Sequence, residues 1–260
     1  MTALPAPGLE ARGVTVRYGG LVAADNVTLT APMGKVTGLI GPNGAGKSTT
    51  FGACGGMVPP SAGTVHLFGE DVTSLSPQAR GQRGLGRTFQ RMELFDSLTV
   101  RENVALGMEA GLAGSRPWRH LRSTRTDRLR TAERVDSALR RCGLEELAET
   151  SASDLSTGQG RLVELARVLA GDFTMLLLDE PSSGLDRAET ERFGEILREV
   201  VATGTGILIV EHDMSLVLTI CDHIYVLDFG KLIFEGIPAD VMASHEVQAA
   251  YLGSTELQAG

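Results

Sequence analysis

The sequence predicts an α/β domain with a mostly parallel central sheet, a β-rich start and a helical insertion. Three observations support this prediction. The first third alternates short β-rich runs with turn residues, and the middle third has apolar residues at helical spacing. The last third contains two wholly apolar runs, residues 175–178 and 207–210, each followed by acidic residues. Such runs are typical of strands that are covered on both faces of a parallel sheet.

The β-rich start shows the period of two that is expected of strands. Val14, Val16 and Tyr18 alternate with polar residues until Gly19-Gly20 ends the run. Further β-rich runs predict strands at residues 27–29, 36–40, 65–67 and 85–89. A helix is expected to begin near Lys47, shortly after the strand at 36–40.

The middle third predicts helices. Thr99 and Glu102 fit a capping box, in which the two side chains satisfy backbone N–H groups at a helix start. Residues 115–118 are interpreted as a linker. Beyond them, apolar residues continue at helical spacing at Leu129, Ala132, Val135 and Leu139.

The last third predicts the helices that connect the buried strands. They are expected at residues 187–202 and 214–221, and Asp186 and Glu189 form a capping pair for the first. No internal repeat or low-complexity segment interrupts the chain. The α/β core is therefore split in sequence by the helical insertion.

The composition excludes several classes of protein. The chain has 260 residues, 42% of them hydrophobic, which is enough to bury a core and excludes a mainly disordered state. No apolar stretch approaches the roughly 20 residues that cross a bilayer, and the N-terminus lacks the features of a secretory signal. The cysteines are scattered and favour a reducing cytosol over a disulfide framework or a metal knuckle. They are Cys54, Cys142 and Cys221.

The charge is unevenly distributed. The formal net charge is -8, yet residues 80–141 contain 14 Arg and no Lys against 7 acidic residues. The arginines at 116–141 have two interpretations: a solvated face of an amphipathic helix, which we favour because acidic residues are interleaved, or a surface that faces anionic headgroups. Nucleic-acid binding is not expected, because this stretch has a single Trp and no other aromatic residue for stacking.

A phosphate-binding loop follows the predicted strand at 36–40. The segment matches the pattern G-x-x-x-x-G-K-[ST] and leads into a predicted helix. Glycines allow backbone N–H groups to surround a phosphate, and the helix N-terminus favours an anion. Lys47 is expected to contact the β- and γ-phosphates, and the Ser48 hydroxyl to coordinate Mg²⁺. The predicted ATP-binding residues here are Gly41, Pro42, Asn43, Gly44, Ala45, Gly46, Lys47, Ser48 and Thr49.

Two acidic residues complete the predicted hydrolysis chemistry. Asp179 and Glu180 follow the apolar run at 175–178, and ligands of parallel sheets bind at the carboxyl ends of strands. Asp179 is expected to hold Mg²⁺, directly or through water. Glu180 is a candidate base that orients or deprotonates the attacking water.

The chain also contains a segment that ordinary phosphate-loop enzymes lack. It reads Leu155-Ser156-Thr157-Gly158-Gln159 and ends 20 residues before Asp179. With these motifs the sequence resembles the ATPase subunits of ABC transporters, from about residue 9 to about residue 253. The segment resembles that family's signature, which lies at the start of a helix. Ser156 and Gln159 also fit an ordinary capping box.

The resemblance implies a site shared between two subunits. In the family, the signature caps the γ-phosphate of ATP held by the opposite subunit, a role that falls here on Ser156, Gly158 and Gln159. The sequence differs from the family's usual signature at two positions. Thr157 replaces the usual first Gly, and Gly160 follows where a longer polar residue is common. Both bear on how tightly the contact between subunits closes.

The resemblance assigns four more residues. Tyr18 corresponds to the aromatic residue that stacks on adenine. Gln90 corresponds to the Q-loop glutamine that reaches Mg²⁺ and the attacking water. His212 corresponds to the switch histidine at the γ-phosphate, and Asp186 belongs to the D-loop at the dimer interface.

The resemblance also implies a detailed fold. It predicts a P-loop NTPase core with a RecA-like, mostly parallel sheet, an N-terminal antiparallel β-subdomain and an inserted helical subdomain. Residues 1–90 and 161–260 are expected to form the ATP-binding core with its β-subdomain. Residues 91–160 are expected to form the helical signature subdomain.

The implied function is ATP hydrolysis that powers transport. The implied partners are ATP, Mg²⁺, a second ATPase subunit in a homo- or heterodimer, membrane permease subunits and, indirectly, an external substrate-binding protein. The resemblance also implies that the protein lies in the cytoplasm and binds peripherally to the inner face of the cell membrane. Several details resemble the branched-chain amino-acid uptake subfamily: residues 87–90, the long stretch before the signature, residues 211–214 and the ending at 250–253.

Other functions stay open. Urea or amide, lipid and lipopolysaccharide transporters share most of these motifs. A soluble ABC ATPase is a further alternative, although such proteins usually have two fused cassettes or long coiled-coil insertions. A regulator without hydrolysis is disfavoured by Glu180, Gln90 and His212.

Overall fold

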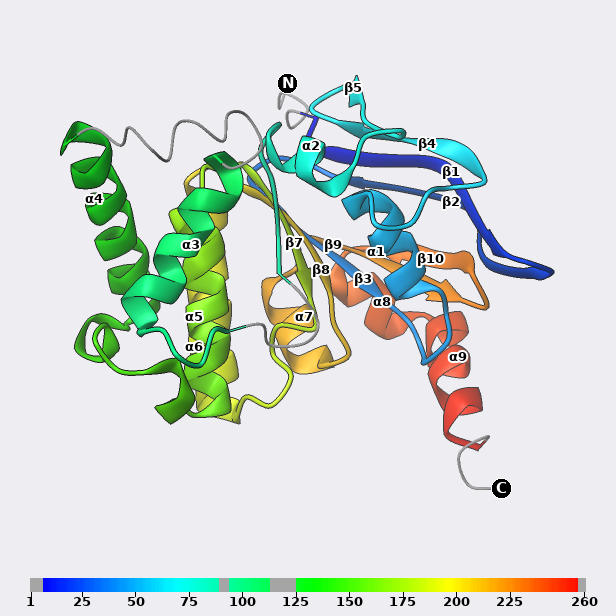
Figure 1. The fold of residues 1–260 in the computed structure, drawn as a ribbon. Coiled ribbons are helices and arrows are strands. Elements are labelled where there is room, and N and C mark those ends of the chain that lie inside the picture. The colour runs from blue at the N-terminus through cyan, green and yellow to red at the C-terminus, as the bar shows by residue number, and fades with distance from the viewer. Residues whose placement is uncertain (1–6, 89–93, 113–124, 257–260) are drawn as a thin grey trace, which may run out of the picture.

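Two β-sheets and a group of helices form the molecule in the computed structural model, which describes residues 7–88, 94–112 and 125–256 (Figure 1). The larger sheet lies between the smaller sheet and most of the helices. This is the predicted α/β class with a mostly parallel sheet. The antiparallel sheet near the N-terminus and the helical insertion that the resemblance implied are also present.

The smaller sheet is antiparallel and has the strand order β2-β1-β4-β5. Tyr18 pairs with Leu21, so Gly19 and Gly20 make the turn between the first two strands as the sequence predicted. Gly19 has a φ of 59°, which favours glycine. The strands are β1 (Leu9–Tyr18), β2 (Leu21–Ala31), β4 (Ala62–Leu67) and β5 (Glu70–Asp71).

The larger sheet has the order β10-β9-β3-β8-β7-β6, and all neighbouring strands are parallel except β10 and β9. Leu176 and Leu178 join the core shared with the helices, whereas Met175 and Leu177 join the core shared with the smaller sheet. Burial on both faces explains why these runs contain no polar residues. The strands are β3 (Val36–Ile40), β6 (Leu85–Arg87), β7 (Met175–Asp179), β8 (Gly206–Val210), β9 (His223–Asp228) and β10 (Lys231–Gly236).

Three helices form a group beside the sheet, which we call the helical group: α3 (Val100–Leu112), α4 (Arg125–Cys142) and α5 (Thr157–Ala170). Val104, Leu139 and Val163 belong to the same hydrophobic core as Leu176 of the sheet. The helical group is therefore packed against the sheet through one continuous core.

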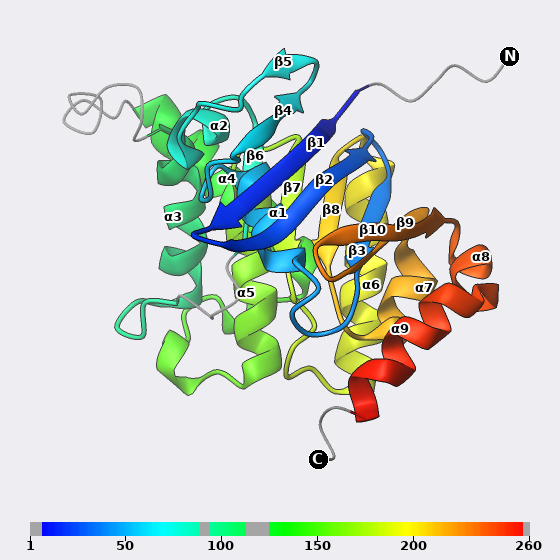
Figure 2. The ribbon, with the colours of Figure 1, turned by 90° about the vertical axis from the view of Figure 1, so that its right-hand side faces the viewer.

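The remaining helices connect strands or follow them (Figure 2). α1 leaves β3 and lies between the two sheets, and α6 links β7 to β8. Two short 3-10 helices, Glu145–Leu147 and Ala152–Asp154, join α4 to α5. The helices are α1 (Lys47–Gly55), α2 (Pro77–Gly81), α6 (Arg187–Ala202), α7 (Met214–Ile220), α8 (Pro238–Ala243) and α9 (His245–Glu256).

Most predicted elements occur at the predicted places. The strand at 36–40, the helix start at Lys47 and the helix at 187–202 are confirmed. The strand expected at 85–89 ends at Arg87, and Phe89 lies outside the described residues. The predicted linker at 115–118 lies outside them as well.

Two further predictions can be compared with the structure. The three cysteines are free and buried, and burial raises the pKa of each thiol to about 12. Within the described ranges, no helix combines the length and the apolar character needed to cross a membrane.

Candidate nucleotide-binding and hydrolysis site

The phosphate loop occupies the turn between β3 and α1. Gly41 has a φ of 150° and Gly46 a φ of 94°. A Cβ at Gly41 would collide with the carbonyl oxygen of Leu227, and one at Gly46 with that of Ala23. Glycine is therefore required at both positions, because other strands pass directly behind the loop.

The β9–β10 turn and β2 hold the loop in place. The Gly230 N–H donates to the Ala45 carbonyl oxygen at 3.0 Å, and the Asp25 N–H donates to the Gly230 carbonyl oxygen at 2.8 Å. At the start of α1, Gly46 provides no side-chain cap, and Ser48 is exposed. The first N–H groups of α1 are thus left for an anion, which the helix dipole also favours.

Lys47 lies back across the loop. Its Nζ donates to the carbonyl oxygens of Gly41 at 2.7 Å and Pro42 at 3.0 Å, and the residue is 7% exposed. Burial lowers the pKa of Lys47, while the charges of Glu180 and Asp179 act in the opposite direction. The ammonium group therefore sits within the electrostatic field of both predicted acidic residues.

Asp179 ends β7 and is nearly buried. Its Oδ2 lies 3.6 Å from Nη2 of Arg87, whereas its Oδ1 is buried and has no hydrogen-bond partner among the described residues. Burial raises the pKa of Asp179, and the nearby Arg87 opposes that shift. A buried carboxylate oxygen without a donor is suited to a cation.

Glu180 occupies an unusual backbone conformation. Its φ is 45°, and its N–H donates to the Val210 carbonyl oxygen at 2.9 Å, which ties the residue to the end of β8. Its Oε2 lies 3.9 Å from Nδ1 of His212. The side chain of His212 is 61% exposed, so it faces the solvent side of the site.

Glu211 was not predicted as a site residue, yet it is fully buried next to His212. Its Oε1 accepts the Ser182 N–H at 2.8 Å, and its Oε2 accepts the His212 N–H at 3.1 Å. Burial raises the pKa of Glu211, and the bonds from Ser182, His212 and Asp213 oppose the shift. The sequence signal for Glu211 is the same as for Asp179, an acidic residue that directly follows a buried strand.

The signature segment begins α5 with the predicted capping box. Ser156 Oγ accepts the Gln159 N–H at 3.2 Å, and Gln159 Oε1 accepts the Ser156 N–H at 2.9 Å. Neither bond uses the Ser156 hydroxyl proton, so the capping role and a phosphate contact are compatible. Gly158 is buried, and a Cβ there would collide with the carboxylate of Glu189.

The signature packs against the predicted D-loop. Arg161 Nε donates to the Ser183 carbonyl oxygen at 3.4 Å. Asp186 caps α6, because its Oδ1 accepts the Glu189 N–H at 2.8 Å. The exposed residue Thr157 lies next to Gly184.

The structure brings some of the predicted residues together. Lys47, Asp179, Glu180 and His212 form one cluster at the carboxyl ends of β3, β7 and β8. Ser156, Gly158, Gln159 and Asp186 form a second cluster at the starts of α5 and α6. Tyr18, at the end of β1, is 52% exposed, and Gln90 lies outside the described residues.

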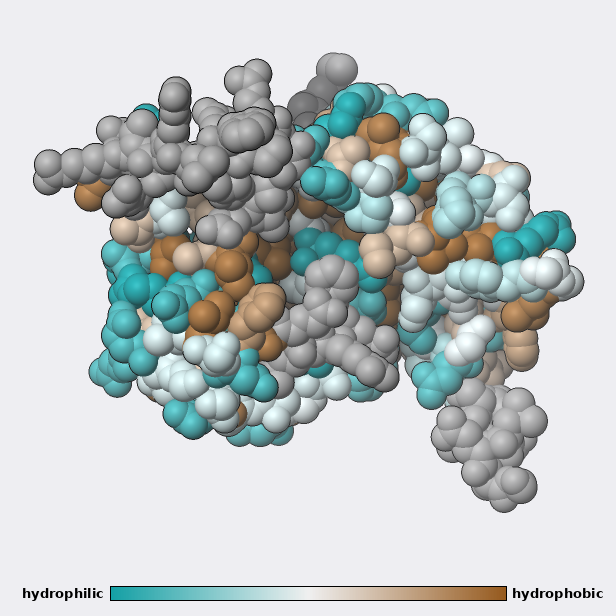
Figure 3. Space-filling model, in the orientation of Figure 1, coloured by the Kyte–Doolittle hydropathy of each residue, from teal (hydrophilic) through white to brown (hydrophobic). Residues whose placement is uncertain are grey.

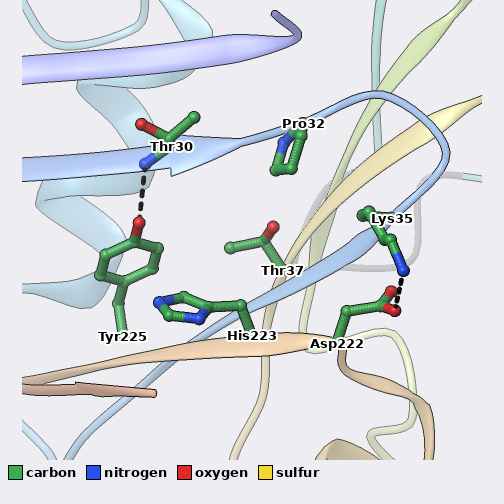
Figure 4. A pocket seen from close by; sticks show the side chains of 7 residues that line it. All are labelled: Thr30, Pro32, Lys35, Thr37, Asp222, His223 and Tyr225. Atoms are coloured by element: carbon green, nitrogen blue, oxygen red, sulfur yellow. Dashed lines mark hydrogen bonds and ion pairs between the residues drawn. The ribbon is translucent and has the colours of Figure 1, made fainter. Parts of the chain in front are cut away.

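A cavity at the opposite ends of the strands is separate from both clusters (Figure 4). It has a volume of about 360 Å³ and contains the Lys35–Asp222 ion pair at 2.7 Å. Tyr225 Oη accepts the Thr30 N–H at 3.1 Å. None of the predicted site residues lines it. The lining residues are Thr30, Pro32, Lys35, Thr37, Asp222, His223 and Tyr225.

Comparisons with known proteins match nearly the whole chain. The family profile described as ABC transporter matches residues 24–183, and that described as branched-chain amino acid ATP-binding cassette transporter matches residues 231–256. The chain is 37% identical to the high-affinity branched-chain amino acid transport ATP-binding protein LivG of Salmonella typhimurium, over 95% of this chain and 98% of that protein. It is 35% identical to BraF of Pseudomonas aeruginosa, with the same coverage, and 32% identical to the lipopolysaccharide export protein LptB of Escherichia coli, over 94% and 97%.

Solved structures give the same result. The ADP conformation of MJ1267, an ATP-binding cassette of an ABC transporter, superposes with a TM-score of 0.84 at 29% identity, over 95% of this chain and 99% of that one. The dimeric structure of MJ0796, a bacterial ABC transporter cassette, superposes with a TM-score of 0.75 at 26% identity, over 88% and 98%.

Proposed function

This chain belongs to the ABC transporter family, as an ATP-binding subunit, and from that premise we propose that it drives the import of branched-chain amino acids through separate permease subunits. Family membership makes it an ATPase that binds ATP and ADP. The observation that supports hydrolysis most directly is the cluster in which Lys47 lies in the field of Asp179 and Glu180, with His212 beside Glu180.

We assign nucleotide binding to the phosphate loop, from Gly41 to Thr49, and to Tyr18. The backbone N–H groups of the loop would bind the phosphates, and Lys47 would exchange its bonds to the Gly41 and Pro42 carbonyls for phosphate oxygens. The exposed ring of Tyr18, at the end of β1, is available for stacking on adenine.

A magnesium ion fits the residues present. The buried Oδ1 of Asp179 has no donor among the described residues, and Mg²⁺ usually takes one or two protein carboxylates together with substrate phosphates. Asp179 and Ser48 would hold it, with Gln90 as the third residue that we assign. When bound, the ion neutralises charge on the phosphates.

The acidic residue after β7 is the proposed base. Glu180 would orient or deprotonate the attacking water, and His212 would donate a hydrogen bond to the γ-phosphate. Ser156, Gly158, Gln159 and the D-loop with Asp186 would complete the site of a second subunit. Because the first cluster lies at strand ends and the second at the starts of α5 and α6, a dimer with ATP between the two clusters of different subunits would use both.

Branched-chain amino acids are proposed as substrates for two reasons. The C-terminal residues match the profile of branched-chain amino acid transporters, and LivG and BraF are similar to this chain. LptB, which is named for lipopolysaccharide export, is 32% identical, so transport of a lipid or of urea or amides is the second candidate. The proposed import also implies an external substrate-binding protein.

The helical group is the proposed contact with the permease. Figure 3 shows apolar residues gathered over this part of the molecule. Leu129 on α4 and Phe95, which lies shortly before α3, are each 57% exposed. We also propose that residues 91–160 act as the coupling subdomain, that residues 1–90 and 161–260 act as the ATP-binding core, and that the subunit works on the cytoplasmic side of the membrane. No role for nucleic acid is proposed.

Uptake into proteoliposomes tests this function. The chain is co-purified with its permease subunits, reconstituted with the external binding protein, and supplied with ATP on its own side. ATP-dependent accumulation of labelled leucine, isoleucine and valine is expected, and Lys47→Ala in the same assembly should abolish it. Accumulation of urea or lipid instead would overturn the substrate class, and failure to bind any permease would overturn the transport role.

A further inference from the structure

Glu211 is a buried carboxylate between two catalytic strand ends. It follows β8 directly, precedes His212, and has no exposed surface. Burying a carboxylate is costly unless donors compensate for the lost water. Glu211 forms no ion pair with Lys or Arg among the described residues, so its compensation comes from the hydrogen bonds it accepts.

The two oxygens of Glu211 accept from different segments. Oε1 accepts the Ser182 N–H at 2.8 Å, in the turn that follows β7. Oε2 accepts the His212 N–H at 3.1 Å, in the turn that follows β8. One side chain thus ties together the turns that hold Glu180 and His212.

The backbone of Glu180 needs this support. Its φ of 45° lies in the left-handed region, which a residue with a side chain adopts only when the surrounding structure enforces it. On one side the Glu180 N–H is held by the Val210 carbonyl oxygen at 2.9 Å. On the other side, two residues later, Ser182 is held by Glu211.

We propose that Glu211 is a positioning residue for ATP hydrolysis, which fixes the turn of Glu180 against the turn of His212. This inference rests on the proposed function, because it assumes that Glu180 is the base. A displacement of a catalytic group by about 1 Å costs on the order of 100-fold in rate. Loss of Glu211 should therefore reduce turnover rather than ATP binding.

A glutamine can replace only part of this function. Its amide oxygen can accept one N–H, but its NH₂ group would then face a second N–H donor. Glu211→Gln should therefore keep the hydrogen bond to one of the two turns and lose the hydrogen bond to the other. Glu211→Ala removes both acceptors and leaves the N–H groups of Ser182 and His212 unsatisfied.

The test compares steady-state ATP hydrolysis of the full chain and these two variants. We expect kcat to fall about 10- to 100-fold for Glu211→Ala and less for Glu211→Gln, with the KM for ATP changed by less than about threefold. The matched control is Asp222→Ala, because Asp222 also holds a strand end by accepting a backbone N–H, that of Val36 at 2.9 Å, but far from this cluster. Its kcat should stay within about twofold of the unmodified chain.

Thermal unfolding separates positioning from loss of fold. If Glu211→Gln unfolds near the temperature of the unmodified chain and still has a lower kcat at unchanged KM, the positioning role holds. Unchanged kcat in this folded variant, or a rise in KM that accounts for the whole loss, would overturn it.

A double variant separates this inference from the assignment of Glu180. If Glu211 acts through Glu180, then adding Glu211→Ala to Glu180→Gln should cause no further loss of turnover. A full additional loss would overturn the inference alone. Normal turnover in Glu180→Gln itself would instead overturn the proposed role of Glu180.

Discussion

At the scale of single residues, Glu180 carries the sharpest prediction. Glu180→Gln removes the proposed base but keeps the shape of the side chain. Turnover should fall by about 100-fold or more, which is typical for loss of a general base, while ATP binding persists and the ATP-bound dimer accumulates. Steady-state hydrolysis and size-exclusion chromatography with ATP measure these effects.

The control for this variant lies on α6. Glu195→Gln changes an exposed carboxylate that pairs with Arg192 at 3.0 Å, away from the site, and should leave the rate unchanged. If Glu180→Gln hydrolyses ATP as fast as Glu195→Gln, the base must be another group.

Lys47 was predicted from the phosphate-loop pattern, Asp179 from its place after a buried apolar run, and His212 from the family resemblance. The structure places all three of these proposed site residues in one cluster. Glu211 and Arg87 were not predicted as site residues. Their importance comes from contacts with neighbouring strand ends, and these contacts depend on strand order, which no local pattern specifies.

At the scale of elements, the two ends of α1 differ from those of an ordinary helix. Its N-terminus follows the phosphate loop, and the carbonyl groups at its C-terminus accept hydrogen bonds from the buried side chain of Arg80. Nη1 of Arg80 donates to the carbonyl oxygens of Ala53 at 2.8 Å and Cys54 at 2.7 Å, and Nη2 to that of Thr73 at 3.0 Å. A cation at this end also complements the helix dipole.

Arg80→Leu should destabilise the protein more than an ordinary surface substitution. We expect the free energy of unfolding to fall by about 2–4 kcal/mol, because several buried carbonyl groups lose their donor. Denaturant-induced unfolding measures this loss. The control is Arg83→Leu, which removes an exposed ion pair with Glu70 at 3.2 Å and should cost about 1 kcal/mol or less. Equal losses in the two variants would mean that the cap contributes nothing.

Strands β9 and β10 were not predicted from the sequence. β10 is half-buried or exposed along its whole length, so it lacks the continuous apolar run of β7 or β8. The β9–β10 turn has positive φ at both Phe229 (43°) and Gly230 (79°), and only the second of these residues is a typical turn residue. Capping boxes, by contrast, were predicted correctly at α5 and α6, because a helix start depends on neighbouring residues alone.

At the scale of the whole molecule, the charge asymmetry can now be located. The Arg-rich stretch includes α4, where Arg134 pairs with Asp172 at 2.8 Å, and Arg101 on α3 pairs with Asp136 on α4 at 2.5 Å. These pairs favour a solvated, ion-paired surface for the described part of the stretch. Arg119 and Arg122 lie outside the described residues, and the membrane-facing interpretation remains a hypothesis about them.

The proposed dimer, with ATP between its subunits, leads to a testable prediction. If ATP binds between the phosphate loop of one subunit and the signature of the other, Lys47→Ala and Ser156→Arg damage different halves of the same site. Each variant alone forms symmetric dimers in which both sites are defective. A mixed dimer has one site with both defects and one site with neither.

Mixing the two inactive variants should therefore restore activity. At equal concentrations, half of the dimers are mixed and each has one intact site, so up to about a quarter of the unmodified rate is expected when the sites act independently. The measurement is ATP hydrolysis as a function of mixing ratio, with a maximum at equal amounts. If the signature acted on ATP bound to its own chain, both variants would stay inactive at every ratio, since no dimer would then contain an undamaged site.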